Sequence, residues 1–252
     1  MFFFYSPLEQ FEILPLFNFF GLFTLTNQFL ALAIIIFCLF TFFFSLLKNS
    51  TQTLFIKPNR WQSVLEIIYL LVLNMVMENI SGNNKHEFFP LIFTIFIFIA
   101  SMNLLGLIPY SFTVTSHFIV TLGLSLSVFI GINIISIRKH KLHFFAIFLP
   151  AGTSILLGLL LVPVELISYI FKPLSLAIRL FCNMMAGHTL LKVFAGFAWS
   201  LMSLNGIFFF LQIIPLAILV PLYCLELAVA LIQAYVFSLL TCIYINDALN
   251  LH

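Results

Sequence analysis

The sequence predicts an all-α polytopic membrane protein. Of its 252 residues, 63% are hydrophobic and 7% are charged, and the mean hydropathy is +1.21. A water-soluble chain cannot cover its surface with so few charges. Ten Lys and Arg nearly balance eight Asp and Glu, which excludes a strongly basic surface for nucleic acid. From the lengths of the apolar runs we expect about five membrane helices plus one interfacial amphipathic helix, the last two helices being long and tilted as an antiparallel hairpin.

The first part of the chain contains one clear span. Residues 1–27 are interpreted as an N-terminal segment, in which 6–12 form a short amphipathic or extended aqueous stretch. A membrane helix needs about 20 apolar residues, and the first run of that length covers 28–47. Residues 88–137 contain two further runs and are predicted to form a helical hairpin.

Residues 61–80 are predicted to form a helix that lies flat in the membrane interface. Gln62, Glu66, Asn74 and Glu78 recur near one face at helical spacing, which is typical of interfacial helices. With this helix flat, seven of the ten Lys and Arg lie on one side of the membrane. Such a bias is what the positive-inside rule expects.

Residues 151–247 are predicted to form a long hairpin. Their two apolar stretches exceed the length of a perpendicular span, so the helices must tilt or bend. Pro163, Pro173, Pro215 and Pro221 provide bends without ending the helices, because packed neighbours can satisfy the freed carbonyls. We treat residues 1–252 as a single membrane domain.

Almost all ionisable residues within the apolar stretches lie in this hairpin. A charge at membrane depth costs about 3 kcal/mol on insertion scales. Apolar sequence flanks Arg179 on both sides, and a guanidinium cannot relay a proton by losing one. Arg179 is therefore interpreted as a fixed barrier; a structural ion pair is the alternative, and the role of Lys172 stays open.

A turn at Asn205-Gly206 would bring polar residues of the two long helices together. In this register three pairs face each other: Arg179 with Gln233, Glu165 with Asp247, and His188 with Glu226. Protonatable groups then lie on both sides of the arginine, which indicates two proton paths.

Small and polar residues also form a stripe on the second-to-last helix. Ser175, Arg179, Asn183 and Gly187 are spaced by four. This spacing is typical of a surface over which a partner slides, and ordinary helix packing is the alternative. The four cysteines lack metal-ligand spacing, so no metal or cofactor is expected.

Several segments resemble one known family. Residues 175–188, with the sequence SLAIRLFCNMMAGH, strongly resemble the signature of subunit a of F-type ATP synthases. Residues 226–237 are similar to its companion helix, and residues 103–109 also resemble the family. Residues 6–12 resemble its mitochondrial branch. The resemblance covers nearly the whole chain.

The resemblance implies a role for each of the polar residues. Arg179 matches the essential stator arginine that faces the c-ring, and Ser175, Asn183 and Gln233 lie in the positions of its polar neighbours. His188 and Glu226 match the half-channel open to the intermembrane space. Glu165 and Asp247 match the half-channel open to the matrix.

The implied function is proton translocation that drives rotation and ATP synthesis, with no covalent chemistry by this subunit itself. Its implied partners are the c-ring, the peripheral stalk, other membrane-sector subunits and the lipid bilayer. The implied location is the mitochondrial inner membrane, and charge bias places the N-terminus towards the intermembrane space and the C-terminus towards the matrix. The alternatives are a self-contained ion-coupled transporter, a quinone- or haem-binding respiratory subunit and a structural anchor.

Overall fold

Helices make up most of the structure, so the all-α fold class is confirmed. The computed structural model describes residues 6–19, 23–50, 60–81, 85–108, 111–141, 155–203 and 211–250. The chain divides into two compact units. The first unit comprises Met1–Gln52, Ile99–His117 and Leu180–Gln233, and the second comprises Thr53–Phe98, Phe118–Arg179 and Ala234–His252.

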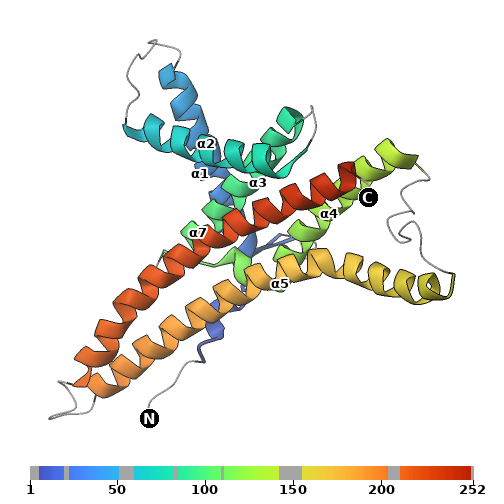
Figure 1. Cartoon of the computed structure of the whole chain (residues 1–252). Coiled ribbons are helices and arrows are strands. Elements are labelled where there is room, and N and C mark those ends of the chain that lie inside the picture. The colour runs from blue at the N-terminus through green and yellow to red at the C-terminus, as the bar shows by residue number, and fades with distance from the viewer. Residues whose placement is uncertain are drawn as a thin grey trace. The chain divides into compact units, whose positions relative to one another are not determined.

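Most of the predicted helices are present, with bounds close to those expected (Figure 1). The helices are α1 (Asn27–Ser50), α2 (Arg60–Asn79), α3 (Lys85–Gly106), α4 (Phe118–His140), α5 (Ile155–Met202) and α7 (Ile213–Leu249), with short 3-10 helices η1 (Glu9–Phe11) and η2 (Val114–Ser116). By length and composition α3, α4, α5 and α7 can each cross a membrane, and Asn27–Thr41 of α1 is a shorter apolar helix. The predicted turn at Asn205-Gly206 lies outside the described residues.

The two long helices exceed the thickness of a bilayer. With 48 residues, α5 is about 72 Å long at a rise of about 1.5 Å per residue, against a hydrocarbon core of about 30 Å. It continues through Pro163 and Pro173, and α7 continues through Pro221. Pro215 is the third residue of α7, in the first turn, where the missing N–H has no helical partner to lose.

An N-terminal β-hairpin was not predicted. Strands β1 (Pro15–Phe19) and β2 (Phe23–Thr26) pair antiparallel, and the register is irregular next to Pro15, which has no N–H to donate. The Asn27 side chain joins the segment before β1 to the start of α1, because its Nδ2 donates to the Glu12 carbonyl at 3.0 Å. Strand β1 (PLFNF) does not alternate regularly, and β2 (FTLT) alternates apolar and polar residues over only four positions, so the sequence gives a weak signal for strands here.

The core of the first unit joins the end of α3 to α5 and α7. Leu107, Met184 and Ala230 form a buried cluster between these elements. In the same unit, Asn103 Nδ2 donates to the Ala230 carbonyl at 3.1 Å, and the Tyr223 hydroxyl donates to the Leu107 carbonyl at 3.2 Å. These contacts fix which face of α7 turns towards α3.

In the second unit α2 is amphipathic, as the sequence predicts. It buries Val72, Met75 and Val76 at helical spacing and exposes Glu66 and Glu78. Its Tyr69 ring meets Phe89 of α3 edge-on, with ring centroids 4.8 Å apart. Among the described helices α2 is not one of those that qualify as a membrane span.

The C-terminal end of α7 is tied to two other elements of the second unit. Lys139 Nζ of α4 donates to the Leu249 carbonyl at 2.9 Å, and His140 Nε2 lies 3.2 Å from the same oxygen. The Ser81 hydroxyl, just beyond α2, donates to Asn246 Oδ1 at 2.7 Å. Cationic side chains at a helix C-terminus stabilise its free carbonyls.

Candidate functional site

The structure brings His188 and Glu226 together, as the hairpin register predicts. His188 Nε2 of α5 lies 3.7 Å from Glu226 Oε1 of α7, which is an ion-pair distance but too long for a hydrogen bond. The Glu226 side chain is only 5% exposed. Its two carboxylate oxygens and His188 Nε2 have no hydrogen-bond partner in the described part of the chain.

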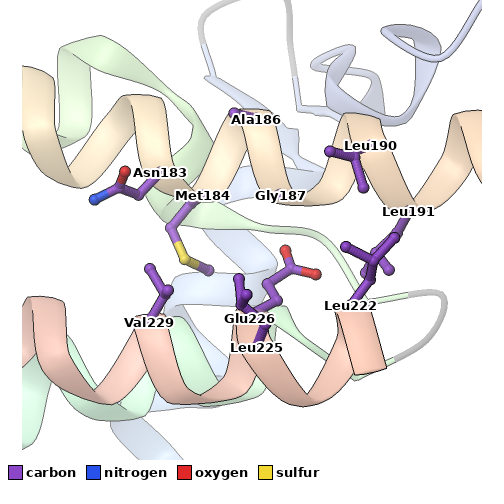
Figure 2. A pocket seen from close by; sticks show the side chains of 10 residues that line it. All are labelled: Asn183, Met184, Ala186, Gly187, Leu190, Leu191, Leu222, Leu225, Glu226 and Val229. Carbon is purple, nitrogen blue, oxygen red and sulfur yellow. The ribbon is translucent and has the colours of Figure 1, made fainter. Parts of the chain in front are cut away.

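A cavity of about 200 Å³ opens beside this carboxylate. Figure 2 shows Glu226 extending from α7 into the space between the two helices. The cavity is lined by Asn183, Met184, Ala186, Gly187, Leu190, Leu191, Leu222, Leu225, Glu226 and Val229. Its volume is sufficient for several water molecules, and its walls are apolar except for Asn183 and Glu226. A carboxylic acid in this place can exchange protons with water.

Gly187 is required by the close approach of the Glu226 carboxylate. A Cβ atom added at Gly187 would lie 2.6 Å from Glu226 Oε1 and 2.9 Å from its Cδ. Both distances are far inside van der Waals contact, so a larger residue would displace the acid. By contrast, a Cβ atom added at Gly196 of the same helix meets nothing within 4 Å.

The α7 face that carries Glu226 also contacts the end of α3. Tyr223, Glu226 and Ala230 are spaced by three and four residues, so they share one face of the helix. Tyr223 and Ala230 make the two hydrogen bonds to α3 and its following loop that were described above. The sequence points to Asn103 only through its family motif, although an amide in an apolar span is itself a signal of a specific partner, and Asn103 is fully buried.

Arg179 lies in the second unit, exposed on α5, and Ser175 is exposed one turn before it. No ion pair among the described residues involves Arg179. The alternative of a structural ion pair within this part of the chain is therefore not observed. Asn183 and Gln233 lie in the first unit and are both partly exposed.

The predicted pairing of Glu165 with Asp247 is wrong. Asp247 Oδ2 instead lies 3.6 Å from Lys172 Nζ, a partner seven residues along α5 from the predicted one. Glu165 lies seven residues before Lys172, or about 10.5 Å along the helix. An ammonium attracts the Asp247 carboxylate, whereas a second carboxylate would repel it. A register set only by the turn position takes no account of the charges of the facing residues.

Aromatic rings hold the Lys172 ammonium in place. Lys172 Nζ is 5.6 Å from the centre of the Tyr169 ring and 5.2 Å from that of Tyr244. These are cation–π distances. Lys172, Asp247 and both tyrosines line a cavity of about 50 Å³, together with Ser136 of α4. No group of three or more metal-ligating side chains is found among the described residues.

Comparison with known proteins identifies the family. The sequence matches the family described as ATP synthase A chain over residues 29–246. The chain belongs to the ATP synthase subunit a family. It is 52% identical over 256 residues to ATP synthase subunit a of Brassica napus, with 98% of this chain and 97% of that protein covered.

Two other ATP synthase a subunits show similar agreement. The chain is 53% identical over 255 residues to ATP synthase subunit a of Pylaiella littoralis, with 99% and 100% of the two chains covered. It is 51% identical over 250 residues to that of Chondrus crispus, with 98% and 97% covered. The protein is therefore a multi-pass membrane subunit of the F-type ATP synthase, which serves proton transport and ATP synthesis. Family membership decides against the self-contained transporter, the respiratory subunit and the bare anchor.

The close approach at Gly187 gives a prediction about ATP synthase activity. In Gly187→Ala the new methyl group displaces the Glu226 carboxylate, and we expect ATP-driven proton pumping by membranes carrying the assembled complex to fall about tenfold or more. Gly196→Ala is the matched control and should pump at the wild-type rate, because its Cβ has open space. Equal pumping by the two variants would show that the position of the carboxylate does not limit transport.

Proposed function

We propose that this subunit conducts protons to and from the c-ring of a mitochondrial ATP synthase through two offset half-channels that Arg179 separates. The observation that carries the proposal is the Glu226 carboxylate, which is buried beside His188 at the wall of a cavity and lacks a hydrogen-bond partner in the described protein. Ionisable groups inside membrane helices are costly, and they persist mainly where a function requires them.

His188 and Glu226 form the uptake path from the intermembrane space. Both side chains can gain and lose a proton, and their separation of 3.7 Å allows transfer after a small movement or through one water molecule. The imidazole also favours protons over sodium as the transported ion, because it is a poor ligand for hard cations.

Arg179 separates this path from the release path. Its exposed guanidinium has no ion-pair partner in the described part of the chain, so its charge is available to a group on another subunit. That group is a carboxylate of the c-ring. The fixed positive charge favours the ionised form of the passing carboxylate and prevents protons from crossing directly between the paths.

Glu165 and Asp247 belong to the release path on the matrix side. Asp247 is about half exposed near the end of α7 and lines the smaller cavity, where a carboxylate can exchange protons with water. Glu165 is partly exposed on α5, two turns from Lys172. We assign Glu165 to the same path as a second acid, without direct contact with Asp247.

The two paths convert proton flow into rotation. A c-ring carboxylate accepts a proton from the uptake path, becomes neutral and can then move through lipid. After nearly a full turn it reaches the release path, loses the proton and passes Arg179 as an anion. Each proton that crosses releases about 2.3 kcal/mol per 100 mV of membrane potential, and this energy drives the ring.

The subunit is proposed to lie in the mitochondrial inner membrane with its N-terminus towards the intermembrane space and its C-terminus towards the matrix. Seven of the ten Lys and Arg then face the matrix, in agreement with the positive-inside rule. Besides the c-ring, its partners are the peripheral stalk and other subunits of the membrane sector.

Loss of Arg179 should both stop ATP-driven pumping and open a proton leak. In Arg179→Ala the charge that separates the two paths is gone, so passive proton flux should rise in membranes stripped of the catalytic head with the ring held fixed. Arg179→Lys should also fail to support synthesis, because an ammonium can lose its proton and lacks the planar fork. Passive flux in Arg179→Ala no higher than in wild type would show that Arg179 is not the seal.

His188 and Glu226 should act as one unit. Exchanging the two residues (His188→Glu with Glu226→His) should retain more proton uptake than either single change, because each single change leaves two like groups face to face. The measurement is ATP-driven pumping by the three variants at equal amounts of assembled complex. Additive losses in the exchanged pair would contradict this coupling.

The orientation can be tested by thiol labelling. The four native cysteines are first replaced by serine, and a single cysteine is introduced at position 49, 139 or 6. A membrane-impermeant reagent should label Asn49→Cys and Lys139→Cys only from the matrix side, and Ser6→Cys only from the intermembrane space. Labelling with the opposite sidedness would invert the proposed topology.

A further inference from the structure

Unpartnered polar atoms are concentrated in the first unit. Among the described residues, eight buried side-chain nitrogen and oxygen atoms have no hydrogen-bond partner, and seven of them belong to this unit. Three of the seven are those of His188 and Glu226, and one is Gln10 Nε2. The other three are Asn103 Oδ1, Thr115 Oγ1 and His117 Nε2.

We propose that Asn103, Thr115 and His117 form the outer part of the proton uptake path and connect the surface of the first unit to Glu226. This inference rests on the proposed function, because it extends the uptake path of His188 and Glu226 outwards. The transported species on this stretch is a proton moving along water and side-chain hydrogen bonds.

Packing within the first unit connects the α7 face that carries Glu226 with the segment that carries Thr115 and His117. Ala230, one turn from Glu226 on the same face of α7, accepts the hydrogen bond from Asn103. Three residues further along α3, a Cβ atom at Gly106 would lie 3.1 Å from Thr113 Cγ2, so the segment that leads into η2 packs closely on the end of α3. Helix η2 in turn packs against α1.

The polar groups of this segment differ in a way that separates structural from conducting roles. Ser116 and Thr113 satisfy each other: the Thr113 hydroxyl donates to Ser116 Oγ at 2.8 Å, and the Ser116 hydroxyl donates to the Thr113 carbonyl at 2.6 Å. Thr115 is equally buried, at 1% exposure, but its hydroxyl has no such partner. A buried hydroxyl without a hydrogen-bond partner destabilises the folded protein, because it has lost its bonds to water. A purely structural role would therefore be better served by valine at position 115.

His117 has the chemistry that proton transfer needs. Its ring stacks on Phe112, with centroids 5.2 Å apart and an angle of 22° between the planes. Burial lowers the pKa of His117, so the imidazole is neutral near pH 7 and carries both a donor and an acceptor nitrogen. A neutral imidazole or a hydroxyl passes on a proton by accepting one and donating another, and returns to its starting composition.

Asn103 lies against the face of α7 that carries Glu226. Its Nδ2 is engaged by α7, whereas its Oδ1 is buried and free to accept a hydrogen bond from water. An amide cannot carry a proton itself, so Asn103 is a positioning residue for water between His117 and the cavity at Glu226.

The test uses isosteric changes in the assembled complex. Thr115→Val removes only the hydroxyl, and we expect proton flux through the membrane sector to fall at least threefold. The temperature at which the sector dissociates should stay the same or rise, because an unpaired polar group has been removed. Thr115→Ser restores a hydroxyl and should restore flux. The matched control is Thr121→Val in α4, whose hydroxyl is already bonded to the Phe118 carbonyl and which should conduct normally.

Glu226→Ala, measured in parallel, distinguishes failure of this inference from failure of the proposed function. If Glu226→Ala blocks flux while Thr115→Val conducts like wild type, the outer path is wrong and the uptake role of Glu226 stands. If Glu226→Ala also conducts normally, the proposed function itself is wrong. A lower dissociation temperature in Thr115→Val, with flux lost in both Thr115→Val and Thr115→Ser, would assign Thr115 a structural role and overturn the inference.

Discussion

The burial of one carboxylate between two long apolar helices constrains much of the first unit. The lipid interior has no water that could hydrogen-bond to Glu226. The surrounding protein must therefore leave room for the acid and for the water with which it exchanges protons. Gly187 has no side chain, which leaves room for the carboxylate. His188 places a second titratable group beside the acid. The hydrogen bonds of α7 to the end of α3 then hold this face of the helix in position.

The two cations on the part of α5 that belongs to the second unit, Lys172 and Arg179, differ in whether the chain supplies a partner for their charge. Lys172 is held by Asp247 and by two tyrosine rings, so its charge is largely compensated within the chain. Seven residues later, Arg179 is exposed and has no ion-pair partner in the described structure. A positive charge left uncompensated on an apolar helix attracts a negative charge from outside the subunit. The contrast separates a cation that stabilises this chain from one that is available to act on another.

Features set by composition and by helical spacing could be predicted from the sequence, whereas features set by choice of partner could not. The apolar runs predict α3, α4 and the two over-long helices, because burying backbone in lipid leaves the helix as the solution for such runs. Antiparallel pairing predicts the contact of His188 with Glu226. The same pairing fails for Asp247, because Lys172 attracts its carboxylate whereas the geometric partner Glu165 carries the same charge. The β-hairpin is hard to predict because its strands are only five and four residues long and β1 lacks regular alternation.

The close contact at Gly187 also links residues that lie far apart in the sequence. Because the backbone at this position touches the carboxylate of residue 226, a change at one place alters which side chains are tolerated at the other. Because the Cγ and Cδ atoms of residue 226 also approach position 187, only a much smaller side chain at 226 would release position 187 from the need for glycine. Substitutions at residue 187 of α5 and residue 226 of α7 are therefore expected to occur together during evolution. This coupling holds even though 39 positions separate the two residues in the sequence.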